Sequence, residues 1–233
     1  MTALRTPPRP TMGRRAFFAA GAGAVVLAST RNAWASEWEV VSRSKGVVVS
    51  LRREADREFP TFRGVGNIAA PIWDVFAVVA DVSSHTEWMH QCIGAKVISV
   101  ESNRIRYVYN RTDAPWPVAD RDVVVRSEVT FPNGGSDIRL EFKGVSGKYI
   151  PILGVVRMPF MLGSYHLKSK GESETQVEYQ VNADPGGTIP DWLVERVTRD
   201  LPMHTVANLR AQAVRKAGSH DLEKLKRELG YEG

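Results

Sequence analysis

A strand changes into a helix within the stretch Ala183-Asp184-Pro185-Gly186-Gly187-Thr188-Ile189-Pro190-Asp191-Trp192-Leu193. Residues 175–181, just before it, alternate between polar and apolar side chains, which is typical of a half-buried strand. Two adjacent glycines allow positive φ angles, and the second proline suits the first turn of a helix, where no backbone N–H is needed. We therefore predict a hinge between the sheet and a terminal helix, formed by Pro185, Gly186, Gly187 and Pro190.

The residues after this hinge predict a long amphipathic helix. Their apolar side chains recur at helical spacing and form one stripe, which the helix would lay on the rest of the domain. Pro202 interrupts the pattern, and a proline inside a helix removes one backbone hydrogen bond and bends the helix. The stripe consists of Ile189, Trp192, Leu193, Val197, Val206, Leu209 and Ala213.

The chain between residue 37 and the hinge is mostly strand. Residues 37–42 and 47–52 predict a hairpin, residues 61–68 predict a third strand, and a helix should start at Pro71 and be followed by a second, short one. Further strands are expected at 95–100, 105–111, 121–131, 138–142, 155–168 and 176–182. This order of elements predicts an α+β fold in which one long helix covers a curved antiparallel sheet.

Residues 1–35 have the pattern of an export signal. They carry a basic start, an apolar run too short for a membrane span, and Ala33-Trp34-Ala35 as a cleavage site. Gly13-Arg14-Arg15-Ala16-Phe17-Phe18 resembles the twin-arginine signal but lacks the usual Ser or Thr before it and Lys after it, so general secretion stays open. We expect an exported, periplasmic bacterial protein, with an uncleaved N-terminal anchor as the less favoured alternative.

The net charge of +5 has its origin in this leader. Of the 31 basic and 26 acidic residues, five arginines and no acid lie among residues 1–35, so the rest of the chain is formally neutral. A neutral domain offers no electrostatic reason to bind a polyanion. We therefore expect no nucleic-acid partner.

Side chains suited to redox or metal chemistry are few and scattered. Cys92 is the only cysteine, so no internal disulfide can form, and its apolar neighbour favours a buried structural thiol over a nucleophile. His85 and His90 lie five residues apart and would not share a helix face, which argues against a metal site with Cys92. We predict no metal and no cofactor.

Three separate blocks share one resemblance. Pro71-Ile72-Trp73-Asp74-Val75-Phe76 with residues 81–88 forms the helix pair, Trp116-Pro117-Val118-Ala119-Asp120-Arg121-Asp122 opens a strand, and residues 183–193 contain the hinge. Together these blocks resemble the START family, the lipid-transfer domains of the helix-grip superfamily. The agreement of three motifs in order is more specific than any one of them.

The resemblance covers residues 36–215. With the export signal (1–35) before it and a charged C-terminal tail (216–233) with room for a short helix after it, we expect one START-like lipid-binding domain at 36–215. The resemblance implies a helix-grip fold, in which a curved antiparallel sheet wraps around a long C-terminal helix. Two short helices follow the third strand, and the fold encloses an apolar cavity.

The implied cavity holds one hydrophobic molecule, and in the family some polar side chains of these strands orient the ligand. Alternation from Arg121 places Val123, Val125 and Ser127 on one face of their strand. Arg121 could instead form a structural ion pair with its acidic neighbours. We expect ligand contacts from Tyr107, Tyr109, Arg121, Val123, Val125, Ser127, Trp192 and Val197.

The segment Lys148-Tyr149-Ile150-Pro151-Ile152-Leu153-Gly154 is unusually apolar for a connection between strands. In START-like folds the loop at this place sits over the cavity mouth beside the lid helix, which implies a gate that touches membranes transiently. Packing of the loop against the terminal helix is the alternative. The expected gate residues are Tyr149, Ile150, Ile152 and Leu153.

We therefore predict a monomeric, non-enzymatic carrier that binds a lipid or sterol-like ligand and transfers it in the cell envelope. The sequence has no serine nucleophile motif, no His-Glu metal pair and no Gly-rich phosphate loop. The superfamily also contains polyketide cyclases and aromatases, so a cyclase-like enzyme is the alternative, with Tyr165 and His166 as the pair to inspect. An interaction domain with a collapsed core is a third hypothesis.

Overall fold

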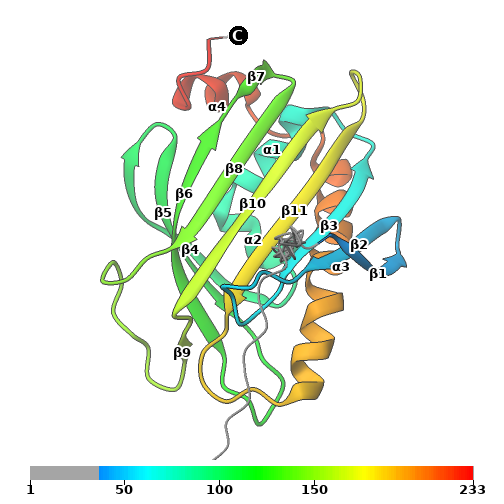
Figure 1. Ribbon diagram of the computed structural model, residues 1–233. Coiled ribbons are helices and arrows are strands. Elements are labelled where there is room, and N and C mark those ends of the chain that lie inside the picture. Colours follow the sequence, from blue (N-terminus) through cyan, green and yellow to red (C-terminus); the bar gives the residue numbers. More distant parts are fainter. Residues whose placement is uncertain (1–36, 233) are drawn as a thin grey trace, which may run out of the picture. The chain divides into compact units, whose positions relative to one another are not determined.

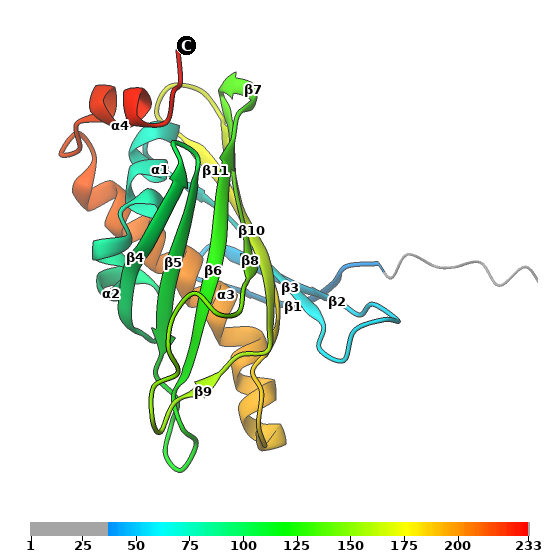
Figure 2. The same ribbon diagram turned by 90° about the vertical axis from the view of Figure 1, so that its left-hand side faces the viewer.

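A computed structural model describes residues 37–232 of the chain, apart from the side chains of residues 191–199. The predicted export signal, residues 1–35, lies outside the described residues. The described chain forms a curved sheet with helices on one face (Figures 1 and 2). Two short helices follow the third strand and a long helix follows the last one, so the predicted α+β fold is confirmed.

The sheet contains ten strands in the order β1-β2-β3-β11-β10-β8-β6-β5-β4, and β9 pairs with β6 beside this path. Neighbours along the path are antiparallel, whereas β9 runs parallel to β6. The bounds are β1 Glu39–Ser44, β2 Val47–Arg52, β3 Thr61–Ile68, β4 Cys92–Ser102, β5 Ile105–Thr112, β6 Arg121–Thr130, β7 Pro132–Gly135, β8 Asp137–Gly144, β9 Val156–Arg157, β10 Phe160–Ser169 and β11 Thr175–Asp184.

Two details of the predicted strands are corrected. The single strand expected at residues 155–168 is divided into β9 and β10. Pro159 lies at the division, and a proline lacks the N–H that a continuous ladder requires. Residues 132–135, which lie between the strands expected at 121–131 and 138–142, form the short strand β7 beside β8.

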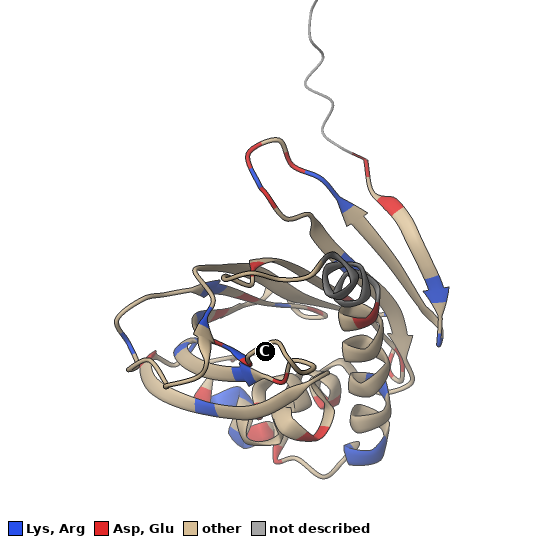
Figure 3. Cartoon of the chain, turned by 90° about the horizontal axis from the view of Figure 1, so that it is seen from below, with Lys and Arg blue, Asp and Glu red and all other residues tan. Residues whose placement is uncertain are grey.

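The helices cover the concave face of the sheet, and the strands curve around them when the domain is seen from below (Figure 3). The apolar face predicted for α1 is buried, because Ile72, Val75, Phe76 and Val79 all belong to the main core. The bounds are α1 Ile72–Ala80, the 3₁₀ helix η1 Val82–Ser84, α2 His85–Trp88, α3 Asp191–Lys216 and α4 Leu222–Glu228.

The long helix α3 lies very close to β3. Glycines make this approach possible: a Cβ on Gly64 would lie 2.9 Å from Pro202 O, and one on Gly66 would lie 3.1 Å from Val206 Cγ1. Arg210 then holds the helix, since its guanidinium donates to Lys45 O at 2.7 Å and to Gly46 O in the turn between β1 and β2, and to Asn67 O in β3. The helix continues through Pro202 instead of ending there.

The segment expected to be a charged tail, residues 216–233, packs on the domain. It contains α4, whose first turn is capped because Asp221 Oδ1 accepts the Lys224 N–H at 2.9 Å. Leu229 is buried in the core, and the ring of Tyr231 lies 4.8 Å from that of Trp73. In Figure 1 this segment lies at the end of the sheet opposite the start of α3.

The predicted hinge has the backbone that its glycines suggest. Gly186 and Gly187 both have φ values of 65°. Asp184 Oδ1 accepts the Gly186 N–H at 2.8 Å, and Arg121 Nη2 donates to Gly186 O at 3.3 Å, which joins the hinge to the start of β6. The helix begins at Asp191, directly after Pro190.

Gly64→Ala is expected to lower the free energy of unfolding by about 1–3 kcal/mol, because the new methyl group would push α3 away from β3. Gly94→Ala is the matched control, since the Cβ there would lie 3.6 Å from Arg111 Cβ, an ordinary contact. It should be neutral or slightly stabilising because it reduces the freedom of the unfolded chain. Thermal unfolding followed by circular dichroism tests both, and equal losses would contradict the role given to Gly64.

Gly186→Ala is expected to destabilise the protein more than Gly187→Ala. Both substitutions force a side chain into the left-handed region, at about 1–2 kcal/mol each. A Cβ on Gly186 would also lie 3.0 Å from Pro159 Cδ, whereas a Cβ on Gly187 would meet Val156 Cγ1 at 3.9 Å. Urea unfolding of the two variants measures the difference. A larger loss for Gly187→Ala would show that the contact with Pro159 is unimportant.

Candidate ligand-binding site

The described residues enclose a cavity of about 240 Å³ between the sheet and the helices. Strands β5, β6, β8, β10 and β11 form one wall, and α1, η1, α2 and α3 supply the other. Most of the lining side chains are aliphatic, aromatic or thioether groups. Among them are Val79, Val82, Val108, Val123, Val125, Leu140, Phe142, Met158, Met161 and Val181.

Partly exposed lining residues mark the mouth of the cavity. Asp113, Ala114 and Pro115 reach it from the loop between β5 and β6, and Pro185 and Ile189 reach it from the hinge. This loop and the start of α3 lie at the same end of the domain in Figure 1. The hinge is therefore part of the mouth as well as the attachment point of α3.

Several of the predicted ligand contacts do line the cavity. Arg121, Val123, Val125 and Ser127 face it together from β6, as the alternation along that strand requires. Arg121 is buried, and its guanidinium donates to Ala119 O and Gly186 O rather than forming the ion pair that was the alternative. Its neighbour Asp120 is bound by Arg111 instead.

Tyr107 and Tyr109 are placed on the other face of the sheet. Tyr107 donates to Glu101 Oε2 at 2.5 Å, and the ring of Tyr109 lies 4.9 Å from that of Tyr149 outside the cavity. The register explains this result, because Thr112 pairs with Arg121 and so the even-numbered residues of β5 share the inner face. The sequence pattern of β5 alone does not reveal its parity relative to β6.

The other two predicted contacts, Trp192 and Val197, belong to the part of α3 whose side chains lie outside the described residues. The two described α3 residues on the cavity wall are Leu201 and Thr205, one turn apart. The ligand contacts expected from Trp192 and Val197, in the N-terminal part of α3, therefore stay predictions.

The four expected gate residues do not line the cavity. Tyr149 packs on the outer face of the sheet, where Lys96 Nζ donates to its hydroxyl at 2.6 Å. Ile150 is 76% exposed and Leu153 is fully exposed, and Ile152 is half-buried. The connection from β8 to β9 is thus an exposed apolar loop beside the sheet, and the neighbouring loop at residues 113–120 takes the place at the mouth.

A polar group that no sequence pattern predicted lies on the inner wall and is formed by His85, Arg106 and Asn110. His85 Nε2 is 3.1 Å from Val79 O, and burial lowers the pKa of His85, so the ring is neutral near pH 7. Arg106 Nη1 donates to Ala80 O at 3.0 Å, and burial also lowers the pKa of its guanidinium. Arg106 and Asn110 are even-numbered residues of β5, so the register of β5 against β6 would have identified both as inward-facing, but it gives no information on His85.

The pair proposed for a cyclase does not act together. Tyr165 faces the cavity, and burial raises the pKa of its hydroxyl well above the ordinary value. His166 points to the other face of β10, where its Nε2 lies 2.7 Å from Asp137 Oδ1. Successive strand residues face opposite sides, so the two side chains cannot serve one reaction centre.

Other chemistry on the described residues is limited. Cys92 is buried, and burial raises the pKa of its thiol, as expected of a structural cysteine. Residues 37–232 contain no group of three His, Cys, Asp or Glu side chains arranged to hold a metal ion. Within the same residues, no helix has the length and apolar character needed to cross a membrane.

Comparisons with known proteins agree with this geometry. The family model of the START domain matches residues 24–217. An uncharacterized protein of Pseudomonas aeruginosa is 33% identical over 194 residues, 83% of this chain and 95% of that protein. The structure of a STAR-related lipid transfer protein from Xanthomonas axonopodis superimposes with a TM-score of 0.68 and 28% identity, and the match covers 76% of this chain and 98% of that one.

A more distant structure shares the fold alone. An aromatase/cyclase from Streptomyces superimposes with a TM-score of 0.50 and 15% identity, covering 67% of this chain and 94% of that one. The match to the family model, by contrast, spans most of the chain, and the structure supplies the enclosed apolar cavity that such a domain uses for a hydrophobic ligand. This chain therefore belongs to the START domain family.

Proposed function

We propose that the protein carries one lipid-like molecule in its cavity through the bacterial cell envelope. The observation that supports this function best is an apolar chamber with a mouth at one end and few polar groups on its wall. A carrier has to replace the apolar surroundings of a lipid with its own side chains, whereas a collapsed interaction domain has no need of such a space. The similarity to a STAR-related lipid transfer protein supports the same class of ligand.

Burial of the ligand supplies the binding free energy. Each methylene group taken out of water contributes about 0.8 kcal/mol, so about ten of them contribute about 8 kcal/mol. That amount corresponds to a dissociation constant near 1 μM before the cost of association is subtracted. A chain of ordinary length is thus bound tightly enough to be carried and weakly enough to be released.

The envelope location rests on the leader. Residues 1–35 have the features of an export signal, and transport of a lipid between membranes requires a carrier in the aqueous space between them. We propose that residues 1–35 direct the chain to an export route and that the mature domain acts in the periplasm as a monomer.

Transient contact with a membrane is proposed at the mouth. Trp116 is 91% exposed in the loop at residues 113–120, next to three residues that line the mouth. Leu153 is fully exposed in the connection between β8 and β9, which projects toward the same end of the domain in Figures 1 and 2. Tryptophan partitions well into the membrane interface, so contact at this end would bring the mouth to the lipid.

The ligand itself tests the function. When the full chain is expressed in a bacterial host and purified, mass spectrometry should find close to one molecule of an apolar compound per protein. Val125→Phe fills the cavity and should reduce this amount by more than half, while Val100→Phe on the exposed side of β4 should not. Equal occupancy in both variants, with both folded, would show that the ligand binds elsewhere.

Removing the apolar groups near the mouth tests the membrane contact. The double variant Trp116→Ser and Leu153→Ser should lower liposome association and the rate of lipid transfer by about a hundredfold, because about 3 kcal/mol of apolar burial is lost while the cavity is untouched. The control variant Val97→Ser and Val100→Ser removes exposed apolar groups from β4 instead. Unchanged transfer in the first variant would exclude this end as the docking surface.

A cyclase-like enzyme is the second candidate, and one observation favours it. His85 Nδ1 is buried at the cavity wall beside Asn110, without a hydrogen bond of good geometry to the described residues, and a neutral imidazole can accept a proton there. The fold shared with an aromatase/cyclase permits this reading. Cyclisation of a linear poly-β-ketone thioester by the purified protein, and its loss in His85→Asn, would support an enzyme over a carrier.

A further inference from the structure

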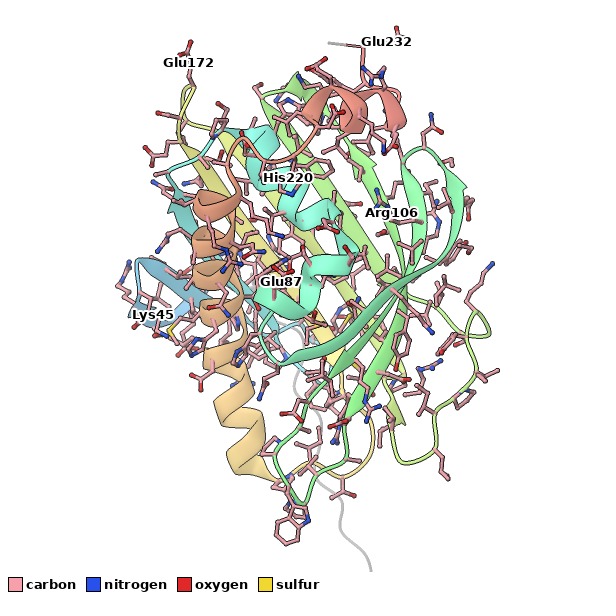
Figure 4. All side chains as sticks on the ribbon, turned by 180° about the vertical axis from the view of Figure 1, so that it is seen from behind. Lys45, Glu87, Arg106, Glu172, His220 and Glu232 are labelled. Atoms are coloured by element: carbon pink, nitrogen blue, oxygen red, sulfur yellow. The ribbon has the colours of Figure 1, made fainter. Side chains whose placement is uncertain are left out.

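The inner wall of the cavity carries a positive charge that has no carboxylate partner. Arg106 lies on the inner face of β5, facing the junction of α1 and α2 (Figure 4). Its one hydrogen bond to the described residues is the bond from Nη1 to Ala80 O. A guanidinium has five N–H donors, so four remain for other partners.

Several other partly buried arginines of the sheet pair with acids, whereas Arg210 and Arg121 bind only backbone carbonyls among the described residues. Arg111 binds Asp120 at 2.5 Å, Arg126 binds Glu128 at 2.7 Å and Arg157 binds Asp122 at 2.6 Å. For Arg106 the described residues include no acid within ion-pair distance, and Glu228 acts on it only through space. Arg106 is half-buried, and a guanidinium that lies partly out of water gains from an anionic partner, so its place on the wall favours a counterion.

The acids of the wall do not supply that counterion. The described lining residues include one carboxylate, Asp113, and it is exposed at the mouth. Arg121, the other lining arginine, lies nearer the mouth, where it donates to Ala119 O in the loop before β6 and to Gly186 O in the hinge, while its Nε has no partner among the described residues. The potential inside the chamber is therefore positive at its inner end, and a low-dielectric wall strengthens that potential.

Two polar side chains beside Arg106 complete a small binding surface. Asn110 lies on the same face of β5. The buried atoms Asn110 Oδ1 and His85 Nδ1 form no hydrogen bond of good geometry with the described residues, although burial lowers the pKa of His85 and the Asn110 side chain is close enough to oppose that larger shift. The two orientations of an asparagine amide are interchangeable, so Asn110 can present either its N–H or its oxygen to a ligand. His85 can accept a proton from an acid group or, once protonated, donate one to it.

We propose that the cavity binds its ligand head first, and that the head is an anionic oxygen acid, a carboxylate or a phosphate, held by Arg106 with Asn110 and His85. This inference rests on the proposed function and adds the class of ligand. Charged hydrogen bonds from a guanidinium to such a group are among the strong ones, and they can be bidentate. A neutral alcohol would satisfy Asn110 and His85 and leave Arg106 without its counterion.

The rest of the cavity suits a single chain. From Arg106 the wall continues through Val108 and Val125 toward the mouth, and it is apolar along this path. The volume of about 240 Å³ is below the usual range of about 300–1,000 Å³ for drug-sized ligands. One acyl or isoprenoid chain matches this space better than the two chains of a phospholipid.

Arg106 also caps the last turn of α1 through Ala80 O, so a loss of stability in a variant would not prove ligand binding. The test therefore starts with the unchanged full-length protein. Its cavity is loaded with the uncharged dye Nile red, and the dye is displaced with dodecanol, dodecanoate or dodecyl phosphate, which share one chain and differ in the head. We expect at least one of the two anions to bind at least about tenfold more tightly than dodecanol, a difference of about 1.4 kcal/mol.

The variants then locate the charge. Arg106→Gln should lower the affinity for the preferred anion at least about tenfold and leave dodecanol unchanged, and Arg106→Lys should restore part of the preference. Arg126→Gln is the matched control, because it removes the same charge from the outer face of β6, opposite Tyr107. Comparison of the two anions distinguishes a fatty acid from a phosphate ester as the source of the head.

The outcomes separate this inference from the function on which it rests. Equal or tighter binding of dodecanol by the unchanged protein would overturn the anionic head and leave a lipid carrier. Equal losses for all probes in Arg106→Gln would do the same, since they would show a structural role alone. Failure of Nile red and all three probes to bind would overturn both the carrier and the inference.

Discussion

The close contact between α3 and β3 is the constraint on which the rest of the structure depends. A curved sheet exposes a concave apolar face that has to be covered, and one helix cannot touch the whole of it. Gly64 and Gly66 bring α3 against β3, and Arg210 holds it to the turn between β1 and β2. Because the helix is pressed to this side, the strands from β5 to β10 curve away from it, and the cavity lies in the space that remains.

This arrangement separates stability from binding. The main core is packed between α1, the C-terminal part of α3 and the strands β2, β3, β10 and β11. Leu229 of the C-terminal segment also belongs to it. The cavity wall on β5 and β6 belongs to a smaller cluster with Val108, Val123 and Val125. A packed half can keep the fold intact while the other half holds a ligand, which is a requirement for a protein that has to exist both empty and loaded.

The polar groups show the same division. Most charged side chains pair on the outer face of the sheet, where water reduces the cost of an imperfect partner. On the inner face, Arg121 donates to backbone carbonyls of the loop before β6 and of the hinge, and Arg106 donates to a carbonyl at the end of α1. Arg106 retains donors that the described protein groups do not use. The chemistry available to a ligand is thus set by a few residues whose position depends on strand parity and not on their own local sequence.

Local patterns in the sequence determined the elements, because alternation, helical spacing and the Pro-Gly-Gly hinge act between near neighbours in the chain. They also placed Arg121, Val123, Val125 and Ser127 together on one face of β6, and the tertiary structure decided that this face lines the cavity. Only the tertiary structure decided that Tyr107 and Tyr109 face outward, since the register between β5 and β6 depends on the length and path of the loop at residues 113–120. The same holds for the mouth and for the unpaired charge of Arg106, because each is a relation between segments that are far apart in the chain and meet only when the sheet closes around α3.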